Sequence, residues 1–348
     1  MKFYKQIIFI LVVFLKTETL LSEDNLFNVN NIQIEKKDKI SNNKLANQAI
    51  KKGFEQLIAK ILLEEDREKF SDLNFSKIKQ LVSYYQITNF TYKTNDKKFV
   101  NLSITFDKDK IHDLFYQKGI SYSQVIDKEL FVLPLLIKDD NIFIFNNNFF
   151  YDNWNEIHKK ELIEFILPLE NIEIIQNINK NKADLINLEI NKLFQEYVNK
   201  NLALILIEDH KSNKKKVYIK AKINEKNISK NLNLKKVNSE SVKIYERIII
   251  EIKRELTNLV KSENLIDVRT PSFLNARLDL KKNSNLVELN SRIKKIDLIE
   301  NISVKQFNKD YMYLRIKYLG KLKKIIEQLN NKNINLIFKD NQWHVKVL

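Results

Sequence analysis

Acidic side chains follow two apolar runs of the chain, a placement that could serve catalysis or cation binding. Asp139 and Asp140 follow the run LFVLPLLI after Lys138, and Glu208, Asp209 and His210 come directly after LALILI. Ligands of open α/β sheets commonly bind beyond the carboxyl ends of the strands. Paired carboxylates there could act as general acid and base or hold a divalent cation. The alternative is a solvated Asp-Asp-Asn turn without a chemical role.

The remaining residues offer little for catalysis. The histidines, at positions 112, 158, 210 and 344, are scattered and lack the HExxH spacing of a zinc site. The chain has no cysteine, which excludes a thiol nucleophile, a disulfide and a lipid-modified mature N-terminus. It also lacks the GxSxG motif of serine hydrolases. We therefore expect no catalytic residue, no cofactor and no metal, and a protein that is not an enzyme.

The segment 143–154 carries aromatic rings interspersed with asparagines. Aromatic and amide side chains together can stack on sugars or cap a partner's peptide, and exposed aromatic patches mark interfaces. One interpretation is therefore a candidate interaction surface; the other is that the rings close the core around the sheet. The candidate surface consists of Asn148, Phe149, Phe150, Tyr151 and Trp154.

The N-terminus has the order of a secretory signal. Lys2 and Lys5 precede the unbroken apolar run IIFILVVFL, and a more polar stretch follows. That run is shorter than the ~20 residues that a membrane-spanning helix needs. We expect cleavage after Ser22 and a periplasmic protein. The alternative is an inner-membrane protein anchored through an uncleaved N-terminal segment.

Composition limits the partners. The 348 residues suffice for two or three domains, and the net charge of +16 favours anionic partners. The lysines are dispersed, with Lys214-Lys215-Lys216 as one of the tightest runs, so they indicate either solvated faces or contact with an anionic polymer or membrane surface. No nucleic-acid-binding module is recognisable, and the signal segment points away from nucleic acid. With only 3 glycines, a Gly-rich phosphate loop is not expected.

Periodicity predicts a small helix-on-sheet unit at the start of the mature chain. Ser41 is expected to cap a helix whose apolar face includes Gly53, where the missing side chain would allow a close approach of backbones. Asp107 and Gly119 are expected to begin and end another helix. The expected strands are 28–34, 87–93 and 98–106, with a turn at 94–97, and the expected helices are the one after Ser41, 73–84 and 108–118.

The pattern of residues 126–268 predicts a sheet that is covered on both sides. Its continuous apolar runs are typical of strands buried on both faces, and they alternate with amphipathic helices. The expected strands are 130–137, 164–169, 202–207 and 216–223, and the expected helices are 182–198 and 240–262.

A last unit follows the boundary at Arg269-Thr270-Pro271. Its strand-helix-strand-strand-helix-strand order is the split, ferredoxin-like pattern, with one more strand at 343–347. We therefore expect an α+β protein with a signal peptide (1–22), an N-terminal βαββα unit (23–125), a central mixed sheet flanked by helices (126–268) and a ferredoxin-like C-terminal unit (269–348).

Several stretches resemble a bacterial family of exported proteins called domain of unknown function 2066. They are AIKKGFEQLIAKIL, VNLSITFDKDKIHDLFYQKGI, LFVLPLLI and EFILPLENIEII, within residues 45–225. The family tends to show the pattern Asn-Pro-Trp-x-x-x-Trp, which Asn148, Phe150 and Trp154 match in part, while Phe149 replaces the proline and Phe150 the first tryptophan. The resemblance implies an exported envelope protein and supplies neither catalytic residues nor a ligand.

These observations predict a non-enzymatic envelope protein that binds or organises another envelope component. Two alternatives stay open. One is an envelope hydrolase or transferase that uses the acidic residues at the strand ends. The other is a binder of anionic polymer or lipid head groups, with peripheral contact to the membrane.

Overall fold

The structure is a computed structural model that describes residues 25–36, 41–93, 97–125, 127–157, 162–197, 199–209, 215–232, 234, 241–280 and 284–348. The predicted signal segment, its cleavage after Ser22 and most of the predicted turn at 94–97 lie outside the described residues. In this part of the chain, mixed sheets flanked by helices confirm the α+β class. Among its helices, none combines the length and the apolar character needed to cross a bilayer.

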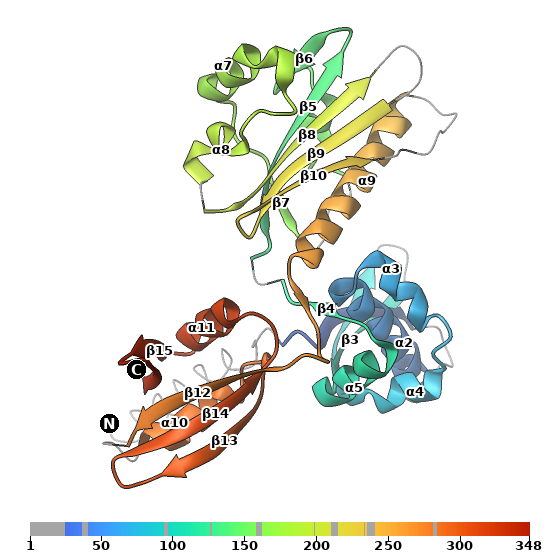
Figure 1. The fold of residues 1–348 in the computed structure, drawn as a ribbon. Helices are drawn as coiled ribbons and strands as arrows, with labels where there is room; N and C mark the ends of the chain where they lie inside the picture. The colour runs from blue at the N-terminus through green and yellow to red at the C-terminus, as the bar shows by residue number, and fades with distance from the viewer. Residues whose placement is uncertain are drawn as a thin grey trace, which may run out of the picture. The chain divides into compact units, whose positions relative to one another are not determined.

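The chain divides into two compact units, coloured along the chain in Figure 1. One contains Ser123–Leu265 together with Lys60–Glu64. The other joins the segment up to Ala59, Glu65–Tyr122 and Ile266–Leu348. The N-terminal and C-terminal segments, which the sequence suggested as separate units, thus group together. The chain passes between the units along β4 (Tyr122–Ser123) and β11 (Leu265–Ile266), which pair.

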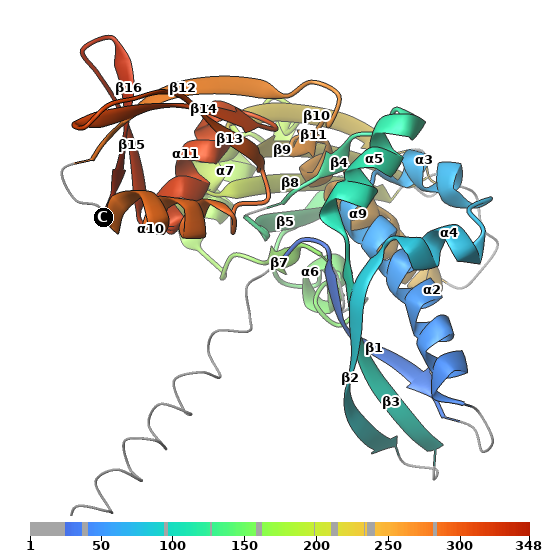
Figure 2. The same cartoon turned by 90° about the horizontal axis from the view of Figure 1, so that it is seen from below.

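A three-stranded antiparallel sheet forms the N-terminal part, in the order β1-β3-β2. Its strands are β1 (Asn28–Glu35), β2 (Val82–Lys93) and β3 (Lys97–Phe106). Helix α2 (Asn42–Ile61) lies along the sheet (Figure 2), and Ser41 Oγ accepts the N–H of Lys44 at its start. Gly53 is buried in this contact, as its place on the apolar face predicted.

We expect Gly53→Val to destabilise this unit. A Cβ at position 53 would lie 2.9 Å from Cδ1 of Ile32 and 3.0 Å from Cδ1 of Ile104. Alanine needs only small shifts of these flexible tips and gains helix propensity, whereas valine adds branches that must displace the sheet, at roughly 1–3 kcal/mol. Urea unfolding of Gly53→Ala, Gly53→Val and the exposed control Lys51→Val measures the difference. Equal stability of the two position-53 variants would contradict the close approach.

Short helices complete the N-terminal part. They are α3 (Glu64–Arg67), whose Glu64 belongs to the other unit, the 3-10 turn η2 (Glu68–Phe70), α4 (Phe75–Gln80) and α5 (Lys108–Lys118). Asp107 accepts the backbone N–H groups of Asp109 and Lys110, and Gly119 adopts the left-handed conformation (φ 63°) that glycine tolerates at a helix end. Both predicted caps of α5 are therefore confirmed. The predicted helix 73–84 is shorter, because β2 already begins at Val82.

The central unit is built on two parallel strands, β5 (Glu129–Lys138) and β8 (Asn201–Asp209). Antiparallel strands flank them in the order β10-β9-β8-β5-β6, and β7 pairs with the start of β5. The antiparallel flanking strands are β6 (Asn141–Phe143), β9 (Lys215–Ile223) and β10 (Lys226–Leu232), and β7 (Glu164–Ile166) runs parallel to β5.

Both faces of the central sheet are buried, as the continuous apolar runs predicted. Alternate residues of β5 enter different clusters: Leu130 and Val132 lie with the inner face of α9 (Ser241–Ser262), whereas Phe131 and Leu133 lie with α7 (Ile172–Lys180) and α8 (Ile190–Leu193). Figure 1 shows α9 on one side of the strands and α7 and α8 on the other.

One predicted helix of the central unit is wrong. In place of 182–198 the chain forms the 3-10 turns η3 (Lys182–Asp184) and η4 (Gln195–Tyr197) around the single turn α8. Helix α7, which was not expected from the sequence, precedes them, and its N-cap is Asn171, whose side chain accepts the N–H of Glu173. Asparagine is a strong N-cap, which favours the start of a helix at this point.

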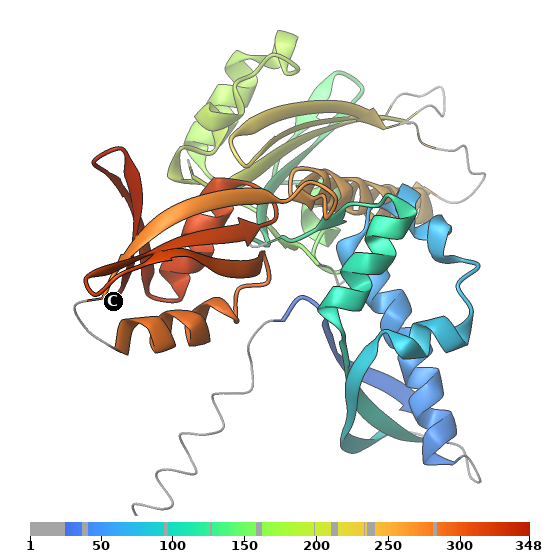
Figure 3. The same ribbon diagram turned by 60° about the horizontal axis from the view of Figure 1, so that its bottom comes forward.

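The C-terminal sheet has the order β13-β14-β12-β16-β15. Its elements are β12 (Ser272–Asp279), α10 (Ser284–Ile293), β13 (Ile299–Phe307), β14 (Tyr311–Tyr318), α11 (Leu322–Asn331), β15 (Ile334–Lys339) and β16 (Gln342–Val347). The predicted strand-helix order is present, and β16 pairs parallel with β12 and displaces β15 to the edge. Helices α10 and α11 lie on one side of the sheet (Figures 2 and 3).

Candidate functional site

Most of the predicted aromatic surface lies in the core. Asn148, Phe150 and Trp154 are each 0% exposed, while Phe149 and Tyr151 are half-buried. Phe150 and Trp154 are four residues apart, so α6 (Phe149–Asn153) and its end direct both rings into the cluster that contains the inner face of α9. The interaction surface is therefore wrong for these three residues, and the alternative, that the rings close the core, holds for them.

The side chain of Asn148 holds this segment in place. Its Oδ1 accepts the backbone N–H groups of Phe150 and Tyr151 and thereby caps α6. The two N–H groups of its Nδ2 are shared among three carbonyl oxygens, those of Pro134 in β5 (2.8 Å), Phe143 at the end of β6 (3.1 Å) and Ile144 just after it (2.7 Å).

The contact with Pro134 explains a proline in the middle of a central strand. On the side of β5 away from β8, β7 pairs only with Glu129–Phe131 and β6 only with Leu136–Lys138. Pro134 lies in the gap between them, where its missing N–H removes no ladder hydrogen bond. The Asn148 amide takes the place of a neighbouring strand at the Pro134 carbonyl.

The acidic pair after β5 forms a hairpin turn. Asp139 and Asp140 join β5 to β6 with positive φ angles of 48° and 63°, and Lys138 pairs with Asn141 across them. Such mirror-image turns favour Asp and Asn because their short polar side chains tolerate this conformation. Both aspartates are exposed, which agrees with the solvated-turn interpretation.

The second acidic segment lies beside the first, because Asp209 of β8 pairs in register with Lys138 of β5. The Asp209 carboxylate is buried and accepts hydrogen bonds from Lys215 Nζ and the Tyr245 hydroxyl. Burial raises the pKa of Tyr245, which keeps that hydroxyl protonated as a donor. The carboxylate thus ties β9 and α9 to β8. His210, the third member of the predicted segment, lies outside the described residues.

The histidines do not gather in the described part of the chain. His112 is buried on α5 and His344 lies half-buried on β16, whereas His158 and His210 fall outside it. No group of three or more histidine, aspartate or glutamate side chains among the described residues could hold a metal ion.

The clearest concentration of binding chemistry lies on the C-terminal sheet, on the face opposite α10 and α11. Along β12 and β14, Leu274 and Leu314 and their alternate neighbours are buried under the helices, and the residues between them form what we call the outer face. Phe273 is 51% exposed there. The outer face consists of Phe273, Asn275, Arg277 and Asp279 on β12 and of Tyr311, Tyr313, Arg315 and Lys317 on β14.

Guanidinium groups and rings are stacked in pairs on this outer face. The guanidinium carbon of Arg315 lies 4.1 Å from the ring centre of Phe273, and that of Arg277 lies 4.4 Å from the ring centre of Tyr311. Tyr313 meets Tyr311 edge-on at 5.1 Å. Stacking of this kind holds a guanidinium flat while its N–H edge stays available for hydrogen bonds.

The two arginines differ in their acidic partners. Arg277 Nε binds Asp279 Oδ1 at 2.9 Å. Among the described residues Arg315 has no such ion pair, and its side chain is half-buried on β14. Arg315 therefore presents the less compensated positive charge of the outer face.

No family model, no curated protein and no solved structure matches the chain.

The strands that carry the outer face were expected from the sequence, whereas the outer face itself was not. Its signal is the alternation in SFLNARLD and YMYLRIKY, where Leu, Ala and Leu alternate along the first strand and Met, Leu, Ile and Tyr along the second. The residues between them are aromatic, basic or polar, with one aspartate. In a one-sided sheet those intervening positions face away from the helices, so the alternation locates the outer face once the strands are known.

Proposed function

We propose that the protein is a non-enzymatic envelope protein, exported by its N-terminal signal, that binds an acidic polysaccharide through the outer face. The predicted signal segment and the resemblance to an exported family support export. Because Phe150 and Trp154 are buried, these two rings offer no surface to a protein partner.

The observation that carries this proposal is Arg315 stacked on the exposed ring of Phe273. The fork of a guanidinium matches carboxylate and phosphate groups, to which it donates two parallel hydrogen bonds. The edges of the aromatic rings beside it offer apolar surface to the C–H groups of sugars. The net charge of +16 adds a long-range attraction for a polyanion.

Single-stranded nucleic acid is the competing polyanion, because bases stack on aromatic rings. On the outer face, however, Arg315 lies over the ring of Phe273 and Arg277 over that of Tyr311. Stacked bases would have to displace these guanidinium groups from the ring faces, whereas a repeating carboxylate or phosphate binds the N–H edge of Arg315 where it lies. Export across the membrane would also separate the protein from nucleic acid.

We expect the full chain to bind polygalacturonate and Arg315→Ala to weaken that binding about tenfold or more, because a charge-assisted hydrogen bond contributes roughly 1.5–3 kcal/mol. Affinity of the wild-type protein should fall steeply between low and physiological salt. Titration calorimetry at two salt concentrations measures both effects. Neutral dextran and an oligo-dT strand serve as comparison ligands.

The matched control is Arg247→Ala, which removes the same charge from an exposed position on α9, where Arg247 pairs with Glu251. This variant should bind polygalacturonate like the wild type. Equal losses of polygalacturonate affinity in Arg315→Ala and Arg247→Ala would show that only the net charge matters, and would overturn the outer face as the binding site. Tighter binding of oligo-dT than of polygalacturonate would replace the polysaccharide with nucleic acid.

A further inference from the structure

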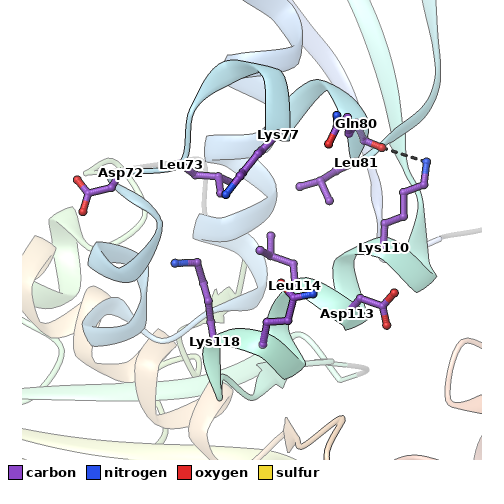
Figure 4. A pocket seen from close by; sticks show the side chains of 10 residues that line it. Asp72, Leu73, Lys77, Gln80, Leu81, Lys110, Asp113, Leu114 and Lys118 are labelled. Atoms are coloured by element: carbon purple, nitrogen blue, oxygen red, sulfur yellow. Dashed lines mark hydrogen bonds between the residues drawn. The ribbon is translucent and has the colours of Figure 1, made fainter.

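A cavity of about 570 Å³ opens between α4 and α5 in the N-terminal part (Figure 4). This volume is in the range of small-molecule sites. Leu73, Leu81 and Leu114 supply its apolar wall. The other lining residues are charged or polar, and they are Asp72, Lys77, Gln80, Lys110, Asp113, Gln117 and Lys118.

The charged side chains of this cavity are sorted by sign. Figure 4 shows Lys77 and Lys118 extending into the space between the helices, whereas Asp72 and Asp113 point away from it. Lys110 is held at the far side by a 3.0 Å hydrogen bond to the Gln80 carbonyl. The interior of the cavity is therefore more positive than the composition of its lining suggests.

One of the inward lysines is fixed in position. Lys118 Nζ donates to the carbonyl of Lys69 at 2.6 Å and lies 5.3 Å from the ring centre of Phe70. An ammonium group has three donors, so a single such bond leaves two for a ligand. The hydrogen bond and the ring contact restrain the long side chain, which reduces the entropy lost when an anion binds.

We infer that this cavity binds a small amphiphilic anion, with a carboxylate or phosphate head between Lys77 and Lys118 and an alkyl body against the three leucines. A leucine wall gains from covering apolar surface, and it offers nothing to a fully polar anion. Two ammonium groups on one side of an apolar wall match a molecule that has its charge at one end. This site lies on other elements than the outer face and does not depend on the proposed function.

The test is binding of decanoate and decyl phosphate to the full chain, measured by titration calorimetry below their micelle concentrations. We expect both to bind, and neutral decanol to bind at least about tenfold more weakly, because the ammonium groups contribute only to an anion. Lys77→Gln should weaken decanoate about fivefold or more, and Lys77→Gln/Lys118→Gln further. Both positions are exposed, so the variants should fold.

The matched control is Asp72→Asn, an exposed change at a side chain that points away from the cavity, which should leave decanoate binding unchanged or slightly tighter. Absence of binding by both anions overturns the inference. So does decanol binding as tightly as decanoate, or equal decanoate affinity in wild type and the double lysine variant. Polygalacturonate binding by the same double variant should stay at the wild-type level, which separates this site from the outer face.

Discussion

Asn148→Ala is expected to lower the free energy of unfolding of the central unit by about 4 kcal/mol, at the high end for a single substitution. The change removes the cap of α6 and leaves the carbonyls of Pro134, Phe143 and Ile144 without the amide that now donates to them. A lost cap costs roughly 1 kcal/mol, and each buried group left unsatisfied costs about 1–3 kcal/mol. Urea unfolding in a Trp343→Phe background follows the transition by fluorescence of Trp154, then the only tryptophan.

Two further variants separate the roles of Asn148. Asn148→Asp keeps an oxygen for the cap and removes the donors, so it should lose at least as much stability as Asn148→Ala, because a buried carboxylate would face carbonyl oxygens. Asn146→Ala is the control, since Asn146 is exposed and its amide only reaches Glu170 at 3.2 Å. We expect a loss below about 0.5 kcal/mol there. A loss below about 1 kcal/mol in Asn148→Ala would show that its side chain does not brace the strands.

Acidification is expected to destabilise the unit that contains the N-terminal and C-terminal segments, through protonation of His112. Burial, with a smaller contribution from Lys108, lowers the pKa of His112 from 6.5 to about 4. Its Nδ1 lies 3.8 Å from Glu300 Oε1, which together with Asp109 and Asp113 opposes the shift. Its Nε2 is buried without a hydrogen-bond partner among the described residues, so a proton added there would have no acceptor.

The sign follows from the two pKa values of His112. Above pH 6.5 the imidazole is neutral in both states and adds no pH dependence. Between pH 6.5 and 4 the imidazole binds a proton in the unfolded chain but stays neutral in the folded protein. The free energy of unfolding therefore decreases as the pH is lowered through this range. The full shift corresponds to roughly 3 kcal/mol. Thermal unfolding at pH 7 and pH 4.5 measures most of this loss.

The matched variants for this effect are His112→Phe and His344→Gln. Phenylalanine keeps a flat ring between Phe27 and Tyr122, whose rings lie 5.6 and 5.2 Å from that of His112, and it cannot take up a proton. His112→Phe should therefore lose clearly less stability on acidification than the wild type. His344→Gln should behave like the wild type, because His344 lies half-buried on β16. An unchanged acid response of His112→Phe would refute the role of this imidazole.

The outer face and the Asn148 contacts show different limits of prediction from sequence. Strands β12 and β14 were expected from the sequence, and their outward residues follow from the alternation along them, which is a local property. The role of Asn148 depends on β5, β6 and α6 meeting at one place. The residues near position 148 do not indicate that β5 lacks a neighbouring strand beside Pro134. Trp154 was ambiguous for the same reason, because an aromatic ring suits a core and an interface equally well.

Local sequence alone determined the α+β class, the burial of strands β5 and β8 on both faces, the caps at Asp107 and Gly119, and the close approach at Gly53. Each depends on a short periodicity or on the conformational range of one residue. Tertiary structure decided that β16 lies between β12 and β15 and that the segment 182–198 forms single turns in place of one helix. It also decided that the Asp209 carboxylate accepts hydrogen bonds from Lys215 and Tyr245. These outcomes are set by which segments compete for the same place in the fold, and that competition involves residues far apart in the chain.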